Sequence, residues 1–212
     1  MKAENALIIF IKNPELGKVK TRIARTTGDA KALDIYFQLS KITRENALLL
    51  RGVTCYLFYS DFVDSMDNWS NIIFQKKLQI QGDLGEKMQA AFAEILNLHP
   101  RVCIIGSDCP TLSTNILNQA FMGLEKNDFV VGPSTDGGYY LLGMAKYNLE
   151  NTPNFEEVPP QYLFQKMAWS TENVLPETLK RIREQGKTVC LLPELTDIDE
   201  EKDWLAYLEN QD

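Results

Sequence analysis

The sequence predicts an α/β protein: a three-layer α/β/α sandwich around a mainly parallel sheet. Short runs rich in β-branched and aromatic residues alternate along the chain with longer helical patterns, as repeated βαβ units require. The chain has 212 residues, of which 44% are hydrophobic, enough to bury a sizeable core. We therefore expect residues 1–212 to form a single domain.

The first half of the chain supplies three expected strands and one long helix. Residues 6–12 (ALIIFIK) form an apolar run that indicates a first buried strand. A helical pattern follows at about 29–50. The runs VTCYLFYS (53–60) and IIFQ (72–75) indicate the next two strands, because β-branched and aromatic residues favour extended backbone.

A helix start is predicted at Asp83, since Glu86 stands three residues later as in a capping box. One face of this helix carries Met88, Ala91, Phe92, Ile95 and Leu96, and the run VCIIG then indicates a strand.

The second half continues the alternation, with one irregular stretch. Ser113 can cap a helix that runs to about Glu125. The expected elements that follow are strands at 129–133 and 139–145, a long loop or insertion from Lys146 to about Tyr162, a helix ending at Gly186, the strand TVCLLP, and a last helical segment, DIDEEKDWLAYLEN.

Net charge and hydropathy indicate which classes of binding partner the protein can have. A net charge of −7 argues against binding to nucleic acid or to anionic lipid. The run ALIIFI is too short for a signal peptide or a membrane span, so we expect a cytoplasmic protein. The first 25 residues nevertheless hold six cations against two acids. This local patch suits a small anion, although a solvated basic face would look the same.

Cysteine and histidine contribute little to the expected chemistry. The four cysteines form no CxxC pair and no metal-ligand spacing. His99, the only histidine, precedes a proline, which argues against a Ser-His-Asp triad or a His-ligated zinc site. Any catalysis is therefore expected to use carboxylates, cations and a divalent metal.

Asp108 is the most informative carboxylate. It lies two residues beyond the apolar run VCIIG, and Pro110 prevents the strand from continuing. Because ligands of open α/β sheets bind at the carboxyl ends of the strands, this carboxylate can hold a metal there. The alternative is a turn residue that accepts backbone N–H groups.

Three further segments are candidates for ligand contacts. The loop KNPELGKVKTR follows the first strand and can wrap phosphates, although it is neither a Walker loop nor a GxGxxG fingerprint. In QGDLG, an amide beside a glycine can pair with a nucleobase edge, and STDGGYY can bring backbone close to a ligand. The candidate residues are Lys12, Gly17, Lys18, Lys20, Thr21 and Arg22 in the first segment, Gln81 and Gly82 in the second, and Asp136, Gly137, Gly138 and Tyr139 in the third.

Taken together, these segments resemble a family of nucleotide-diphospho-sugar transferase-like proteins of the glycosyltransferase-A fold. The series K-x-P-x-x-G-K-V-K-T-R, Q-G-D-L-G, G-S-D-C-P, D-G-G-Y-Y-L-L-G, W-S-T and D-I-D carries the resemblance along nearly the whole chain. The resemblance implies a Rossmann-like nucleotide-binding domain, Mg²⁺ or Mn²⁺, and a nucleotide-sugar donor with a small-molecule acceptor.

The sequence departs from this family in two places. The stretch from Lys146 to Tyr162 is longer than the family pattern, so the resemblance implies no acceptor specificity there, and the motif after the strand VCIIG differs. Glycosyltransferase-A enzymes typically carry Asp-x-Asp after this strand, whereas Gly106, Ser107 and Asp108 leave one carboxylate. SDCP resembles the metal-binding strand end of nucleotidyltransferases, and KTRIA resembles the first loop of phospholactate guanylyltransferase. Sugar transfer is the first expectation. The alternatives are nucleotidyl transfer from a nucleoside triphosphate to a phosphorylated small molecule, and a nucleotide-binding module without catalysis.

Sugar transfer and nucleotidyl transfer would use the same groups to neutralise the phosphates. A metal on Asp108, helped by Lys18, Lys20 and Arg22, would neutralise the diphosphate. Asp136 would deprotonate an acceptor hydroxyl or hold the sugar. Mg²⁺ generally uses one or two protein carboxylates, and Asp199, which follows the last strand, is the expected second ligand. The alternative is that Asp197 or Asp199 caps the final helix.

Overall fold

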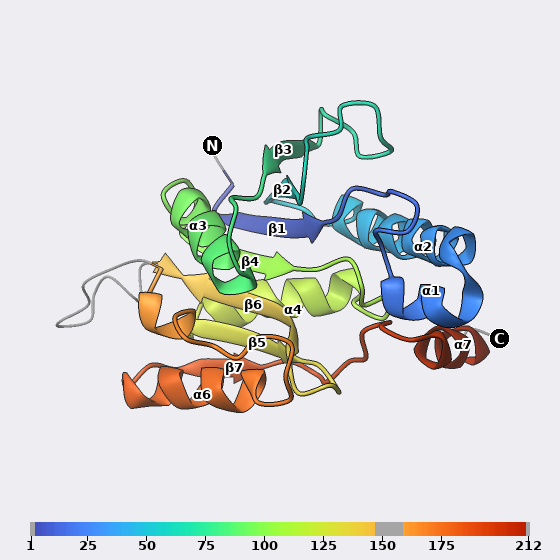
Figure 1. Cartoon of the computed structure of the whole chain (residues 1–212). Coiled ribbons are helices and arrows are strands. Elements are labelled where there is room, and N and C mark those ends of the chain that lie inside the picture. Colours follow the sequence, from blue (N-terminus) through green and yellow to red (C-terminus); the bar gives the residue numbers. More distant parts are fainter. Residues whose placement is uncertain (1–2, 147–158, 211–212) are drawn as a thin grey trace.

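The computed structural model describes residues 3–146 and 159–210. Within these residues the chain forms one seven-stranded sheet with the order β3-β2-β1-β4-β6-β5-β7 (Figure 1). All pairings are parallel except those of β6, which runs antiparallel to β4 and β5. The strands are β1 Asn5–Ile11, β2 Val53–Tyr59, β3 Phe74–Leu78, β4 Arg101–Ile105, β5 Phe129–Pro133, β6 Tyr139–Ala145 and β7 Val189–Leu191.

Helices cover both faces of the sheet, which gives the predicted three-layer α/β fold. The side chains of α3 and α6 pack on one face and those of α4 on the other. A smaller cluster joins α1, α2 and α7 at one end of the molecule (Figure 1). The helices are α1 Thr21–Thr27, α2 Asp29–Leu48, α3 Leu84–Leu96, α4 Thr114–Leu124, α6 Val174–Glu184 and α7 Glu201–Glu209, with a short 3₁₀ turn, η1, at Gln161–Leu163.

The direction of β6 corrects the expectation of a parallel strand at 139–145. Only residues 134–138 connect it to β5, and a parallel neighbour would need a crossover of about a dozen residues or more. Gly137, with φ +86°, allows the tight turn between the two strands. β6 therefore begins at the carboxyl edge of the sheet, where its neighbours β4 and β5 end.

Helix caps were predicted more accurately than the third strand. Asp83 and Glu86 form the expected capping box of α3, and the Ser113 side chain accepts a hydrogen bond from the N–H of Ile116 at the start of α4. The third strand lies at Phe74–Leu78, two residues later than the run IIFQ indicated. Most of the expected loop from Lys146 to Tyr162 falls at 147–158, outside the described residues.

In the part of the chain that the structure describes, none of the helices combines the length and the apolar character needed to cross a membrane.

Candidate functional site

A cavity of about 610 Å³ opens along the carboxyl edge of the sheet. Its floor comes from the residues that follow β1, β2, β3 and β4, together with the first two residues of β6. This is where ligands of open α/β sheets bind, and the volume lies within the usual range of about 300–1,000 Å³ for ligand pockets. The floor residues include Lys12, Ser60, Gln79, Gly106, Ser107, Asp108, Tyr139 and Tyr140.

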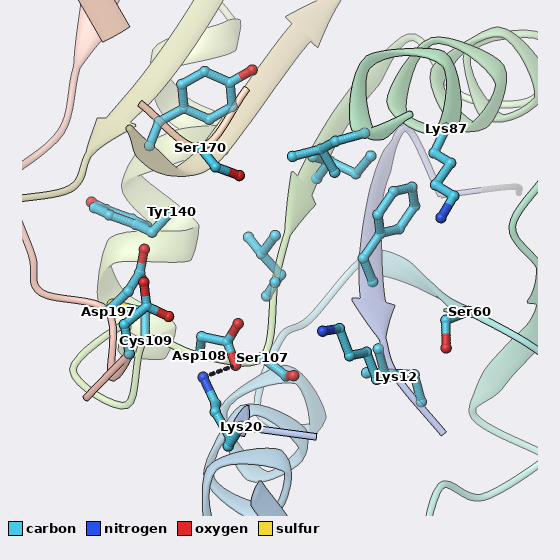
Figure 2. A pocket seen from close by; sticks show the side chains of 18 of the residues that line it. Lys12, Lys20, Ser60, Lys87, Ser107, Asp108, Cys109, Tyr140, Ser170 and Asp197 are labelled. Atoms are coloured by element: carbon cyan, nitrogen blue, oxygen red, sulfur yellow. Dashed lines mark ion pairs between the residues drawn. The ribbon is translucent and has the colours of Figure 1, made fainter. Parts of the chain in front are cut away.

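An ion pair between Lys20 and Asp108 stands in the middle of this cavity (Figure 2). Lys20 Nζ lies 2.5 Å from Asp108 Oδ1 and donates a hydrogen bond of 2.7 Å to the Ile198 carbonyl oxygen. The Lys20 side chain is only 7% exposed, whereas that of Asp108 is 44% exposed. One buried cation therefore connects the loop after β1, the end of β4 and the segment that precedes α7.

The backbone at Lys20 is unusual. Its φ of 48° and ψ of 44° are left-handed, a conformation that costs a non-glycine residue about 1–2 kcal/mol. Lys20 is also the N-cap of α1, and Ile23 on that helix is fully buried against α2 and α7. Packing of α1 therefore fixes the strained residue, and with it the position of the ammonium group.

Asp197 and Asp199 bring two more carboxylates to the same place. Asp197 accepts a 3.0 Å hydrogen bond from Ser134 Oγ, and burial, reinforced by the charge of Asp108, raises its pKa to about 6. Burial also raises the pKa of Asp199, although the charge of Lys20 opposes this. Asp108 acts on both groups, so the three carboxylates lie within range of mutual repulsion.

Neither Asp197 nor Asp199 caps the final helix. Glu200 occupies the N-cap of α7, and the Asp203 side chain accepts the backbone N–H of Glu200. Asp199 instead faces Arg22 at 3.4 Å. Both side chains of that pair are well exposed, and such surface pairs stabilise by about 0–1 kcal/mol.

Asp108 does not behave as a turn residue. Among the described residues its carboxylate pairs with Lys20 and accepts no backbone N–H. Its backbone carbonyl accepts the N–H of Ile198 at 2.9 Å, which attaches the 197–199 segment to the end of β4. The carboxylate is thus free of any turn function and faces the cavity.

The cavity has two chemically different ends (Figure 2). Lys12, Ser60 and Lys87 lie at one end. The opposite end holds Asp197 and Tyr140 together with Ser170. Asp136 lines the cavity and lies with Asp197. The first end can therefore hold negative charge, the second can hydrogen-bond hydroxyl groups, and Phe10 and Met88 add apolar side chains to the cavity lining.

The structure brings together some of the predicted site residues and separates others. Those that line the cavity are Lys12, Lys20, Thr21, Arg22, Asp108, Asp136, Tyr139 and Asp199. Gly17, Lys18, Gln81, Gly82, Gly137 and Gly138 do not line it. Lys18 pairs with Glu15 at 2.8 Å, and Gly82, in the left-handed region, precedes the capping box of α3. Ligand contacts by these six residues stay predictions.

Sequence reasoning gave no site role to several polar residues of the cavity wall, among them Gln79, Lys87 and Ser170. Gln79 directly follows β3, and its side-chain amide donates to the Phe58 carbonyl oxygen at 3.0 Å. Lys87 faces the cavity from α3, and Ser170 from the segment before α6. Gln79 was recognisable as a polar residue at a strand end, but placing Lys87 and Ser170 required the packing of α3 against residues 159–175.

The donor atoms at Asp108 and Asp199 suit a hard divalent cation. Within residues 3–146 and 159–210 no three His, Cys, Asp or Glu side chains are arranged to hold a metal ion. Mg²⁺, however, commonly takes one or two protein carboxylates and completes its shell with substrate phosphates and water. A cation at the repelling carboxylates would also lower the repulsion that raises the pKa of Asp197 and Asp199. The donor set therefore fits Mg²⁺ or Mn²⁺ bound together with a diphosphate.

Comparisons with known proteins agree with this fold. A family described as an uncharacterized protein conserved in bacteria (DUF2064) matches residues 44–171. A structure from Desulfovibrio desulfuricans G20, described as a candidate nucleotide-diphospho-sugar transferase, superposes with a TM-score of 0.81 at 26% identity, covering 93% of this chain and 83% of that chain. No curated protein matches the chain.

Two more distant structures share the fold alone. The 4-diphosphocytidyl-2C-methyl-D-erythritol synthase of Anaerococcus prevotii DSM 20548 has a TM-score of 0.60 at 13% identity, covering 97% of this chain and 96% of that chain. Rv0371C of Mycobacterium tuberculosis H37Rv, solved in complex with manganese, has a TM-score of 0.55 at 10% identity, covering 97% of this chain and 98% of that chain. The chain thus has the fold of nucleotide-diphospho-sugar transferases and cytidylyltransferases.

Proposed function

The chain belongs to the DUF2064 family, and we propose that it is a metal-dependent transferase that uses a nucleotide-sugar donor. One observation carries this proposal: a single cavity joins a cationic, partly apolar end to a carboxylate-lined end, with the Lys20–Asp108 pair between them. A nucleotide-sugar has the same order of groups, namely a base, a diphosphate and a sugar. The likeness to the Desulfovibrio protein supports the same reading.

The nucleoside would occupy the end that holds Lys12 and Lys87, and the apolar side chains of Phe10, Leu84 and Met88 in the cavity lining suit the faces of a base. Lys12 and Lys87 border this end and can reach phosphate oxygens. Next along the cavity, Lys20 and Arg22 place two more cations beside Asp108. Preorganised charge in a partly enclosed site stabilises a leaving diphosphate, and removal of one such contact costs about 3–4 kcal/mol by analogy with an oxyanion donor.

The sugar and the acceptor then lie toward Asp136 and Tyr139. Asp136 is exposed on the cavity wall, and its Oδ1 accepts the N–H of Gly138 at 2.9 Å. This hydrogen bond orients the carboxylate, which can then take a proton from an acceptor hydroxyl or hold a hydroxyl of the sugar. A carboxylate of this kind is needed when the nucleophile is a neutral hydroxyl group.

Asp108 and Asp199 would hold the metal. When bound, Mg²⁺ or Mn²⁺ supplies Lewis-acid stabilisation of charge on the diphosphate. The ammonium of Lys20 holds Asp108 and the Ile198 carbonyl in place, so it keeps the two halves of the metal site together. Arg22 faces Asp199 and limits its movement.

Nucleotidyl transfer is the second candidate, because one observation favours it. β4 is followed by Gly106-Ser107-Asp108, with one carboxylate where sugar transferases of this fold typically have two. A phosphorylated acceptor already carries a negative nucleophilic oxygen, so this reaction would use the cations of the site and would not need Asp136.

Calorimetry separates the candidates. The protein is titrated with UDP-glucose, GDP-mannose, CTP and GTP, each with Mn²⁺ and with EDTA. Metal-dependent binding of a nucleotide-sugar with weaker triphosphate binding supports sugar transfer, and the reverse order supports nucleotidyl transfer. Equal nucleotide affinity with Mn²⁺ and with EDTA, together with no turnover of any bound nucleotide, supports a non-catalytic module and contradicts the proposal.

Asp108→Asn tests the metal site directly. The amide keeps the size of the side chain and loses its charge, so metal-dependent nucleotide binding should fall by about 100-fold, since even substitutions beside metal ligands commonly cost about 10- to 100-fold in metal affinity. The melting temperature should fall somewhat, because Lys20, only 7% exposed, loses its charged partner, so binding is measured well below the melting temperature of the variant. Normal Mn²⁺-dependent binding by this variant would show that Asp108 holds no metal.

A further inference from the structure

The segment 169–172, which carries the motif W-S-T, has no role in the function proposed so far. Its residue Ser170 lines the carboxylate end of the cavity and is exposed there (Figure 2). Its φ is +62°, a left-handed conformation that a β-carbon disfavours. Strained residues of this kind persist where the surrounding structure holds them, and they cluster at ligand-binding sites.

Neighbouring contacts hold Ser170 on both sides. On one side, the indole of Trp169 packs directly on Gly85 of α3, where a β-carbon would lie 2.7 Å from Trp169 Cζ2. On the other side, the backbone of Glu172 lies against Gly137, and the N–H of Leu175 donates to the Gly137 carbonyl oxygen at 2.9 Å. We call residues 169–172 the strap.

The strap therefore explains two glycines that do not line the cavity. Gly85 belongs to the motif Q-G-D-L-G and Gly137 to D-G-G-Y, and each provides the space into which the strap packs. A side chain at either glycine would push the strap outward. The three motifs thus form one wall of the cavity, which keeps Ser170 at a fixed place between α3 and the turn that carries Asp136.

From this geometry we infer that Ser170 is a specificity-determining residue whose hydroxyl binds the sugar of the donor; the inference rests on the proposed function. Ser170 lies at the cavity end with Asp197 and Tyr140, on the side of Asp108 opposite Lys12 and Lys87. A serine hydroxyl is neutral, donates one hydrogen bond and accepts others, which matches the hydroxyl groups of a sugar. A phosphate at that end would meet the carboxylates of Asp136 and Asp197, which lie together there.

Two substitutions separate the hydroxyl from the backbone strain. Ser170→Ala removes the hydroxyl and keeps a β-carbon in the left-handed conformation. Ser170→Gly removes both the hydroxyl and the strain, and should raise the melting temperature by about 1–3 °C. Lys166→Gly is the matched control, because Lys166 also has a positive φ of 53° and is exposed but does not line the cavity.

The readout is calorimetry with Mn²⁺, comparing UDP-glucose with UDP and GDP-mannose with GDP. Both Ser170 variants should bind the nucleotide-sugar about 3- to 10-fold more weakly, as expected for one hydrogen bond, and bind the sugar-free diphosphate within twofold of the wild type. Lys166→Gly should bind all four like the wild type.

Three results would overturn the inference: unchanged nucleotide-sugar binding by both Ser170 variants, an equal loss for the sugar-free diphosphate, or a loss in only one of the two variants. In each case the wild type still binds the nucleotide-sugar, so the proposed function stands. A wild-type protein that binds neither nucleotide-sugar overturns the proposed function itself and the role of Ser170 with it.

Discussion

Asp197→Asn should make the metal-free protein more stable at neutral pH and leave its stability unchanged near pH 4. In the folded protein, burial and the nearby charge of Asp108 raise the pKa of Asp197 from its ordinary 3.8 to about 6. Well below pH 3.8 the carboxyl is protonated in both states. Between about pH 4 and pH 6 the unfolded chain gives up this proton while the folded protein keeps it, so stability falls over that interval and stays lower above pH 6.

The loss in the free energy of unfolding follows from the pKa shift of Asp197. A shift of about two pH units corresponds to about 3 kcal/mol, and the partial exposure of the Asp197 side chain lowers this to about 1–2 kcal/mol. Asparagine can still accept the hydrogen bond from Ser134, so little else changes. For a chain of this length the variant should melt about 3–6 °C higher than the wild type at pH 8.

Thermal melting in EDTA from pH 4 to pH 8 measures the effect. Asp136→Asn is the comparison: the charge of Asp136 is a minor cause of the raised pKa of Asp197, so this variant should raise the melting temperature at pH 8 by much less than Asp197→Asn does. If Asp197→Asn lowered the melting temperature at pH 8, or raised it equally at all pH values, the unfavourable ionisation of Asp197 would be refuted.

Three further predictions concern other contacts. Arg22→Ala should weaken nucleotide binding in low salt more than in high salt, whereas Lys41→Ala, which removes an exposed cation of α2 that does not line the cavity, should not. Equal effects of the two substitutions would contradict the role of Arg22. Asp199→Asn should lower Mn²⁺ affinity measured with nucleotide present while the melting temperature stays nearly constant; unchanged affinity would exclude Asp199 as a ligand. Lys76→Met should lower the free energy of unfolding, measured by urea titration, by about 3 kcal/mol. The substitution removes the cation that lies 2.7 Å from Asp67 in an almost buried ion pair. A loss below about 1 kcal/mol would show that water solvates Asp67.

The local parts of this structure could be predicted from the sequence because they depend on neighbouring residues. The capping box at Asp83 and Glu86 and the cap at Ser113 use contacts three residues apart. The strand at 129–133 was recognised from its apolar residues, and the position of Asp108 followed from the end of an apolar run. The parallel character of most of the sheet followed from the alternation of strands and helices.

Other features depend on contacts between distant segments. The short third strand was displaced, and α1 was not predicted, because a seven-residue helix depends on the burial of Ile23 against α2 and α7. Likewise, the wall of the cavity includes Lys87 and Ser170 only because Trp169 packs on Gly85.

The sequence by itself determined which chemical groups are available: one carboxylate after the strand at 101–105, a cationic loop after the first strand, and carboxylates after the last strand. Tertiary structure decided which of them meet. Lys20 reaches both Asp108 and the Ile198 carbonyl oxygen, 178 residues away in sequence, because α1 packs against α7 and the N–H of Ile198 binds the Asp108 carbonyl. No periodicity or spacing encodes that contact, since it arises from side chains that fill the space between separate elements.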